Sequence, residues 1–209
     1  MALPIVSGAS TDQLSVTTKK GALITPIEPA YGTAGGGFVV AGSATAVVAA
    51  ALAANTTLMA ARFAVASARK AYLNKIQYQF HTVTAAAAAA VPAQVAFQKF
   101  TTATPTGGTP RTPMRKNTSE GSTTDMTDVR DSNAALTVTG VVFTDLPIVF
   151  LNPAFTVSGT MAVFEWRFDP TYNQPLVLQP GEGLALRTQA AHPATMTWMY
   201  SYVMDWSER

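Results

Sequence analysis

The stretch that decides the fold is Trp198-Met-Tyr-Ser-Tyr-Val-Met-Asp-Trp206, close to the end of the chain. Its large side chains fall on every second residue, and this period predicts a β-strand with one buried face. Five large side chains on one face can cover much of a sheet. We therefore expect this strand to pack against the core with Trp198, Tyr200, Tyr202, Met204 and Trp206.

The same two-residue period recurs earlier in the chain. One segment is predicted to place Tyr72, Ile76, Tyr78 and Phe80 on one face and Lys75, Gln77, Gln79 and His81 on the other. In another segment Phe164, Trp166 and Phe168 alternate with Val163, Glu165 and Arg167. Further strands are predicted at 95–100, 134–143 and 148–150, and Pro180-Gly181 predicts a type II turn. Many strands, closely spaced turns and no convincing amphipathic helix predict an all-β, two-sheet β-sandwich or jelly roll.

Two alanine-rich segments leave alternatives open. Residues 44–54 suit a helix by propensity, but neighbouring valines and a turn signal at Asn55-Thr-Thr57 favour two strands between 38 and 65. The six alanines at 85–90 fit a hairpin loop or one helical turn, which Pro92 would limit.

Residues 1–36 are predicted to form an extended N-terminal arm, and 37–209 the β-sandwich domain. Prolines break up the arm, glycines at 32–37 suggest a hinge, and 13–24 suits a short hairpin. The arm is either a disordered terminus or a clasp on a neighbouring subunit. Its apolar residues favour the clasp, so Leu14, Val16 and Leu23 are candidate interface residues.

Residues 101–133 are the polar zone of the chain, and their composition predicts a long surface connection. Within it, charged residues gather between 111 and 131, which makes this part a candidate contact with another subunit; the alternative is a loop that only aids solubility. Asp125, Asp128 and Asp131 lack the glycine turn and alternate spacing of a calcium loop, and suit a solvated turn or a short capped helix. The basic candidates for the interface are Arg111, Arg115, Lys116 and Arg130.

Composition narrows the function classes. The 209-residue chain is 48% hydrophobic but only 12% charged, with a net charge of +2 and no cysteine. It therefore has no disulfide or thiolate chemistry and no strong basic footprint for nucleic acid. A low-charge surface suits a subunit of a large assembly, although an Ala- and Thr-rich genome would also produce it.

Catalytic, cofactor and membrane signatures are absent from the sequence. The beginning, Met1-Ala-Leu-Pro4, is unlike a signal peptide, and the uncharged stretch 29–61 is too interrupted to span a membrane. His81 and His192 have no carboxylate at metal-ligand spacing, and Glu165 is better explained by a cross-strand ion pair than by catalysis. The aromatic rows fit a buried sheet face better than a ligand platform. We expect no catalytic residue, no metal and no cofactor.

Three C-terminal motifs resemble the closing strands of a group of tailed-bacteriophage virion proteins, and two earlier stretches look similar to these proteins too. They are Glu165-Trp-Arg-Phe168, the turn region 176–186, the ending 195–208, Pro110-Arg-Thr-Pro-Met-Arg-Lys116 and the arm at 10–20. The resemblance implies a non-enzymatic capsid decoration or cement protein of the virion, assembled in the bacterial host cytoplasm. Its implied partners are the major capsid protein lattice and copies of itself, not nucleic acid or membrane.

A second function class stays open. A receptor- or carbohydrate-binding β-sandwich of a tail fibre, tail spike or adhesin would use aromatic side chains exposed in a groove. Buried aromatics, an extended arm and a large self-interface favour the virion subunit. An enzyme whose catalytic groups converge only in the fold is a third class that no sequence feature recommends.

Overall fold

The computed structural model describes residues 15–16, 23–24, 36–48, 52–84, 93–101, 103–117, 123–139, 142–152, 159, 161–169, 176–192 and 196–209. In this part of the chain every regular element is a strand, and no helix is long and apolar enough to cross a membrane. The strands are β1 (Ser15–Val16), β2 (Leu23–Ile24), β3 (Gly36–Val48), β4 (Thr57–Phe63), β5 (Ala71–Thr84), β6 (Ala93–Thr101), β7 (Thr109–Arg111), β8 (Met114–Arg115), β9 (Met126–Leu136), β10 (Thr144–Asn152), β11 (Met161–Arg167), β12 (Leu176–Leu178), β13 (Glu182–Thr188) and β14 (Thr197–Glu208).

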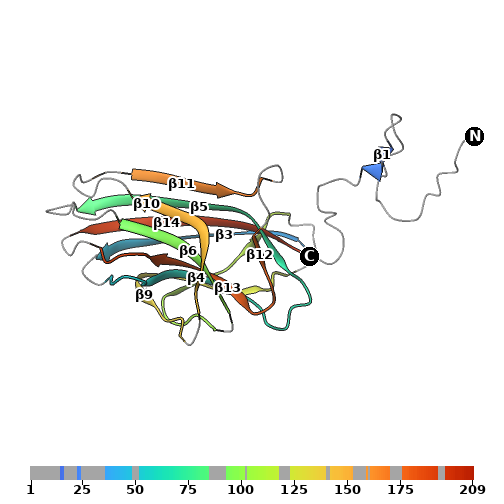
Figure 1. The fold of residues 1–209 in the computed structure, drawn as a ribbon, viewed down its shortest axis with the longest axis horizontal. Helices are drawn as coiled ribbons and strands as arrows, with labels where there is room; N and C mark the ends of the chain where they lie inside the picture. Colours follow the sequence, from blue (N-terminus) through green and yellow to red (C-terminus); the bar gives the residue numbers. More distant parts are fainter. Residues whose placement is uncertain are drawn as a thin grey trace, which may run out of the picture.

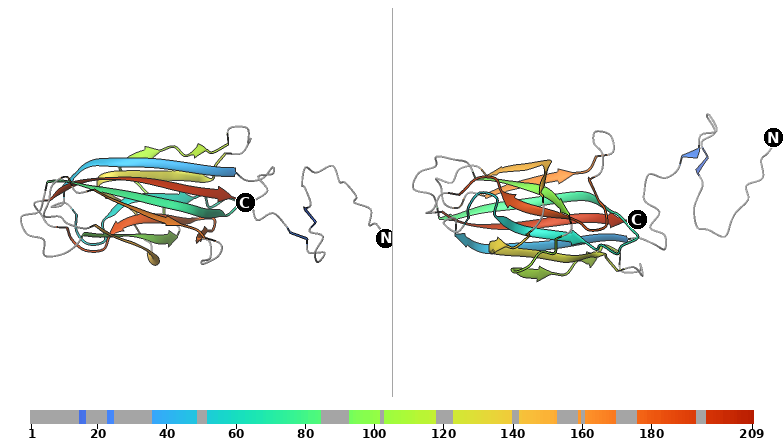
Figure 2. Two further views of the ribbon diagram at one scale, coloured as in Figure 1. Left: turned by 90° about the horizontal axis from the view of Figure 1, so that it is seen from above. Right: turned by 60° about the horizontal axis from the view of Figure 1, so that its bottom comes forward.

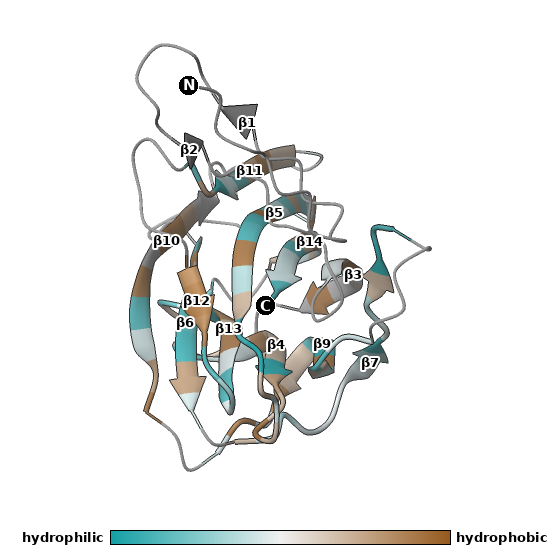
Figure 3. Ribbon diagram, turned by 90° about the vertical axis from the view of Figure 1, so that its right-hand side faces the viewer, coloured by the Kyte–Doolittle hydropathy of each residue, from teal (hydrophilic) through white to brown (hydrophobic). Residues whose placement is uncertain are grey.

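Two antiparallel sheets pack face to face, which confirms the predicted all-β, two-sheet sandwich (Figure 1). The first sheet has the order β11-β5-β14-β3-β8, and β12 pairs with the end of β5. The second has the order β10-β6-β13-β4-β9-β7. Figure 3 shows the two layers end-on, with β11 and β10 at one side of the sandwich and β7 at the other.

β14 lies in the middle of the first sheet, between β3 and β5, and the three strands run side by side along the molecule (Figure 2). Its burial alternates as predicted. Trp198, Met204 and Trp206 are fully buried, and Tyr200 and Tyr202 are 2% exposed. Burying such a side chain contributes roughly 1.5–3 kcal/mol, so this strand supplies a large share of the core's stability.

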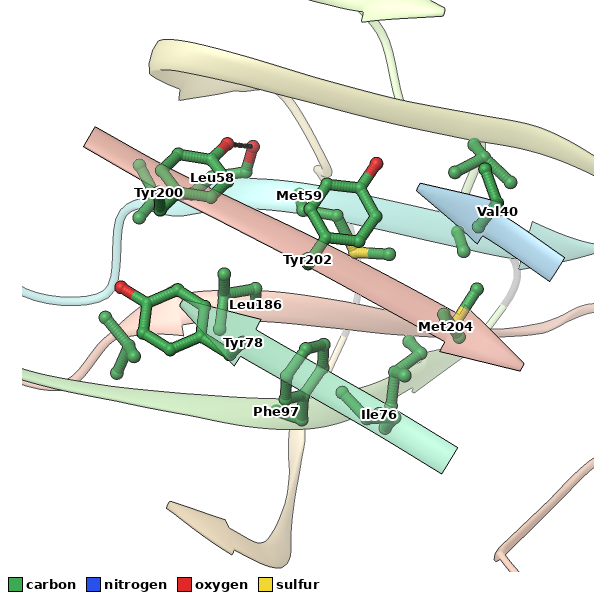
Figure 4. Packing of buried hydrophobic residues seen from close by; sticks show 14 of the residues in the cluster. Val40, Leu58, Met59, Ile76, Tyr78, Phe97, Leu186, Tyr200, Tyr202 and Met204 are labelled. Carbon is green, nitrogen blue, oxygen red and sulfur yellow. Dashed lines mark hydrogen bonds between the residues drawn. The ribbon is translucent and has the colours of Figure 1, made fainter. Parts of the chain in front are cut away.

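The core fills the space between the sheets with aromatic and aliphatic side chains. Tyr78 of β5 stacks on Phe150 of β10, with ring centroids 5.5 Å apart, and Phe80 packs against Trp198 at 5.2 Å. Figure 4 shows Tyr78, Tyr200 and Tyr202 of the first sheet facing residues of the second sheet, among them Leu58 and Phe97. Because both sheets contribute to one cluster, the sandwich is a single folding unit in the described residues.

The second sheet is also covered on its outer face, which the sequence does not predict. A smaller cluster there consists of Ala60, Phe100, Ala103, Leu136 and Ala185, with Val138 and Phe143 packed against it. The strand predicted at 134–143 is therefore wrong beyond Leu136, where β9 ends. Gly183 of β13 leaves room for the Phe100 ring, because a Cβ at position 183 would overlap that ring.

The strands predicted between 38 and 65 are confirmed as β3 and β4, and Asn55 occupies the left-handed region between them (φ 64°). Asparagine tolerates this conformation better than most residues. Gly36 and Gly37, which the sequence suggests for a hinge, instead begin β3 and pair with Glu208 and Ser207.

Tyr72 does not share a face with Ile76, contrary to the prediction. Ala71 and Leu73 are buried at one end of β5, whereas Ile76, Tyr78 and Phe80 are buried further along. The change of parity coincides with an irregularity at Asn74, where the pairing with β14 skips from Lys75 to Leu73. A bulge of this kind shifts the inward and outward positions by one residue.

The polar zone is not one long surface connection. Residues 126–133 belong to β9, which pairs with β4 and β7, and Met126, Val129 and Asp131 are 0–1% exposed. The prediction that 111–131 form a surface excursion is therefore wrong for the β9 part. Sequence reasoning failed here because the core accepts a carboxylate, Asp131, at a position where an apolar residue is the ordinary signal.

The Pro180-Gly181 turn is confirmed and joins the two sheets. Gly181 has φ 82°, and the Glu182 N–H donates to the Gln179 carbonyl at 2.9 Å. β12 before the turn pairs with β5, whereas β13 after it pairs with β4 and β6. The 85–92 segment, with its two alternatives, lies outside the described residues.

Candidate interaction site

A groove of about 420 Å³ opens at the edge of the sandwich where β7 and β8 lie. Three of the four basic residues predicted for an interface line it: Arg111 in β7, Arg115 in β8 and Arg130 in β9. The strand order explains why they meet. β7 is the edge of one sheet, β8 is the edge of the other, and only Thr112-Pro113 separates them along the chain.

Arg111 is held by a buried carboxylate. Its Nε donates to Asp131 Oδ2 at 2.7 Å and its Nη2 to Asp131 Oδ1 at 3.0 Å, a two-point ion pair. Nη2 also donates to the Ser43 carbonyl of β3 at 2.9 Å. The hydrogen bond with the Asp131 carboxylate raises the pKa of Arg111 above its usual value. One side chain thus connects β7, β9 and β3, and so links the two sheets at this edge.

Tyr202 completes the arrangement from the opposite sheet. Its hydroxyl donates to Asp131 Oδ2 at 3.1 Å. Burial, and then the Asp131 charge, raise the pKa of Tyr202 well above 10. Gly42 of β3 makes the contact possible, because a Cβ at that position would overlap both the Asp131 carboxylate and the Tyr202 hydroxyl.

The neighbouring Tyr200 hydroxyl fastens the same strand to two others. It lies 2.9 Å from the Leu58 carbonyl oxygen of β4 (Figure 4). It also lies 2.8 Å from the Ser132 carbonyl oxygen of β9. Burial raises the pKa of Tyr200, so the hydroxyl stays protonated and donates. Two tyrosines on a buried face require acceptors inside the core. That requirement was the available sequence signal for a buried partner such as Asp131.

The other predicted basic residues are also engaged within the chain. Lys116 Nζ pairs with Asp205 Oδ2 of β14 at 2.7 Å, and Arg130 Nη1 donates to the Gly107 carbonyl at 3.0 Å. Arg115 pairs through its backbone with Phe38. The structure therefore brings Arg111, Arg115 and Arg130 to one groove, whereas it directs Lys116 toward the outer face of the first sheet.

A second buried carboxylate, Glu208, ties the end of β14 to two loops. It accepts from the Trp206 indole N–H at 3.0 Å, the Asp125 backbone N–H at 3.0 Å and the Thr124 hydroxyl at 2.5 Å. Arg69 pairs with both Glu208 (3.3 Å) and Asp125 (2.8 Å). The three aspartates 125, 128 and 131 are therefore not a solvated turn or a capped helix: Asp128 and Asp131 lie in β9, and Asp125 anchors the chain just before it.

The opposite edge of the sandwich, formed by β10 and β11, is aromatic. Phe164 and Trp166 are partly buried and pack against the core, and with Ile148 and Phe150 they border a cavity of about 310 Å³. Of the tryptophans expected in the core, Trp198 and Trp206 are confirmed, while Trp166 is only half-buried because it lies at this edge. Glu165 forms the predicted cross-strand ion pair, with Lys75 at 3.6 Å, and also pairs with Arg167 at 3.1 Å.

The two histidines lie in different surroundings. His81 is half-exposed on the outer face of the first sheet, where it borders a cavity of about 410 Å³ with Met161 and Met199. His192 is 6% exposed and packs against the Trp198 ring at 5.3 Å, and burial lowers its pKa to about 4. Within the described ranges, no group of three His, Asp or Glu side chains is placed to hold a metal ion.

Of the three arm candidates, the structure describes the strands that contain Val16 and Leu23. Leu14 is not described. Val16 in β1 pairs with Leu23 in β2, so the short hairpin predicted within 13–24 is confirmed. Whether Leu14, Val16 and Leu23 contact another chain stays a prediction.

No known protein-family model matches the chain, and no curated protein or solved structure matches it significantly. The fold class therefore rests on the structure alone, and the resemblance to tailed-phage virion proteins stays a prediction.

Proposed function

We propose that the chain is a non-enzymatic structural subunit of a tailed-bacteriophage particle. Its role is that of a capsid decoration or cement protein, which binds the major capsid protein lattice and copies of itself and so stabilises the virion. Assembly would take place in the host cytoplasm, without nucleic acid or membrane as a partner.

The observation that carries this proposal is where the aromatic side chains lie. Trp198, Tyr200, Tyr202 and Trp206, which would form the obvious platform for a sugar, are at most 2% exposed and pack between the sheets. Their role is to hold the sandwich together. Burial of these aromatics favours a structural subunit over a carbohydrate-binding module.

The charges support the same role. Only 12% of the residues are charged, and several of these form ion pairs inside one copy, among them Arg111 with Asp131 and Lys116 with Asp205. Such pairs leave a surface with a weak electrostatic field. A surface of this kind is suited to close packing against neighbours, where each unpaired charge would cost desolvation energy.

Cryo-electron microscopy of purified particles tests the proposal directly: density for this sandwich on the capsid is expected. The matched variants are Arg115→Glu, in the groove, and Lys70→Glu, at an exposed site elsewhere. Arg115→Glu should reduce occupancy on particles, and more strongly at low salt. Changing Arg115 and Lys116 together would be harder to interpret, because Lys116→Glu would also replace the ion pair with Asp205 by two neighbouring carboxylates. Absence of the protein from particles would refute the proposal.

One observation supports a second function, the binding of a receptor or a carbohydrate. Phe164 and Trp166 border the cavity at the β10–β11 edge and are only partly buried, as a receptor- or carbohydrate-binding sandwich would require. Titration with cell-surface glycans distinguishes the two. Saturable quenching of tryptophan fluorescence that Trp166→Ala abolishes would favour glycan binding, whereas an unchanged signal favours the structural subunit.

A further inference from the structure

Besides the three-residue β12 at the end of β5, the described residues place four strands at the two open sides of the sandwich, and three of these four carry features that discourage pairing with another chain. β10 contains Pro147, which has no N–H to donate, and its register with β6 shifts between Asp145 and Val149. β7 is three residues long and contains Pro110, and β8 is two residues long and follows Pro113. Prolines, irregular pairing and short length are the usual means of protecting a sheet edge.

β11 has none of these features. It pairs with β5 over seven residues without a break, from Met161 opposite His81 to Arg167 opposite Lys75. No other strand of the described residues pairs with it on its outer side. Met161 and Val163 are 61% and 52% exposed, so an apolar stripe runs along the strand. Its charged side chains, Glu165 and Arg167, are of opposite sign, so a straight edge of this length is a template for strand addition by a partner whose charges match them.

The inner side of β11 is also incompletely covered. Phe164 stacks on Phe150 at 5.4 Å and on Tyr78 at 6.3 Å, continuing the aromatic core outward to the edge. Beyond it, Trp166 is only partly buried and borders the cavity between β10 and β11. An added strand would extend the sheet and remove more of this aromatic surface from water.

The sequence of β11 specifies which strand fits. Glu165-Trp166-Arg167 is self-complementary in an antiparallel arrangement: a two-fold axis at Trp166 places Glu165 opposite the partner's Arg167, and the converse. The two side chains are 37% and 67% exposed, so they are accessible to a partner. An axis at Glu165 or at Arg167 would instead place like charges opposite each other, which is destabilising.

We propose that β11 is a self-association edge. Two copies of the chain pair antiparallel at the end of β11 about a two-fold axis at Trp166, so that residues 165–167 of one copy lie opposite 167–165 of the other and the first sheet continues between them. Two Glu165–Arg167 pairs fix the register, and Trp166 lies against its counterpart. The same patch serves both copies, as two-fold symmetry requires. This inference deepens the self-binding part of the proposed function and names its surface.

The test is the mass of the full-length chain in solution, measured by sedimentation velocity over a concentration series. The variants are Arg167→Glu, which makes the edge self-repelling, and Glu165→Arg with Arg167→Glu, which restores complementarity in the opposite sense. Lys70→Glu, at an exposed position outside both the groove and β11, is the control. Circular dichroism checks that each variant is folded.

A concentration-dependent dimer is expected for the native chain and for Lys70→Glu. Arg167→Glu should weaken dimerisation about tenfold or more, because two cross-strand attractions become repulsions, and the double swap should restore it. Hydrogen exchange of 165–167 should slow as the concentration rises. A native chain that stays monomeric, or a swap that fails to restore the dimer lost in Arg167→Glu, would overturn the proposal. A dimer in solution without occupancy on particles would leave this edge intact and refute only the virion role.

Discussion

Removing the Arg111 guanidinium should reveal how much the buried Asp131 carboxylate depends on its partner. Arg111→Met keeps the aliphatic part of the side chain and leaves a carboxylate that is 2% exposed with only the Tyr202 hydroxyl to stabilise it. Breaking a buried ion pair in this way typically costs about 3–5 kcal/mol. Because Arg111 itself is 30% exposed, water can partly replace it, and we expect a loss near the lower end, about 3 kcal/mol.

A second substitution separates the effect of the uncompensated Asp131 charge from a simple loss of packing. Asp131→Asn on the Arg111→Met background removes the uncompensated charge but keeps an acceptor for Tyr202. The double variant should therefore be more stable than Arg111→Met alone, by about 1–2 kcal/mol. Urea unfolding at pH 7, followed by the fluorescence of the buried Trp198 and Trp206, measures both changes. Lys70→Met, at an exposed position away from the network, is the control and should change stability by less than about 0.5 kcal/mol.

Two results would refute this reasoning. A loss below about 1 kcal/mol for Arg111→Met would show that the carboxylate is stabilised without the guanidinium. A double variant less stable than the single one would show that Arg111 acts through packing and not through charge. Either result would remove the argument that this network links the two sheets at the β7–β8 edge.

Three further predictions follow from the same core. Trp198→Ala should lower the free energy of unfolding by about 3–5 kcal/mol in urea, since the side chain is fully buried, and a loss under about 1 kcal/mol would contradict its place in the core. Gly42→Ala should destabilise the protein strongly in the same assay because its Cβ would overlap Asp131 and Tyr202, whereas Ala41→Ser, at an exposed position of the same strand, should have little effect. The pKa of folded His192, about 4, lies below its unfolded value near 6.5. Between these pH values the unfolded chain binds a proton that the folded chain does not, so stability is lost as the pH falls from 6.5 to 4. Unfolding of the native chain and of His192→Phe at several pH values in this range should give a shallower loss for the variant, by about 2–3 kcal/mol in total, and parallel curves would contradict this assignment.

The central strand was predictable because each of its residues carries the signal. Trp198 to Trp206 alternate without exception, and an alternating strand has only one way to bury its large side chains. The Pro180-Gly181 turn was predictable for a similar local reason, since only a few residue pairs suit a type II turn. Tyr72 was misassigned because the bulge at Asn74 depends on pairing with β14, more than a hundred residues later in the chain.

β9 was missed because its inward positions are justified only by distant residues. Asp131 is buried because Arg111 and Tyr202 meet it there, and Asp125 is fixed by Glu208, 83 residues away. The sequence placed Arg111, Arg115 and Arg130 in one polar zone, and three-dimensional structure brings them to one groove. The pairing of Lys116 with Asp205 could not be predicted from the sequence, because that contact needs β8 and β14 to lie on either side of β3.

The contrast between the edges has a consequence for how such sandwiches associate. Each copy has two open sides, and a chain that protected neither side would add strands in both directions and grow without limit. Here the side formed by β7 and β8 is closed by prolines, short strands and the Arg111 bond to the Ser43 carbonyl of β3. On the other side β10 is protected by Pro147, and among the described strands β11 alone presents a straight edge of this length. One unprotected edge per copy, with a self-complementary sequence, permits a closed pair and prevents a fibre.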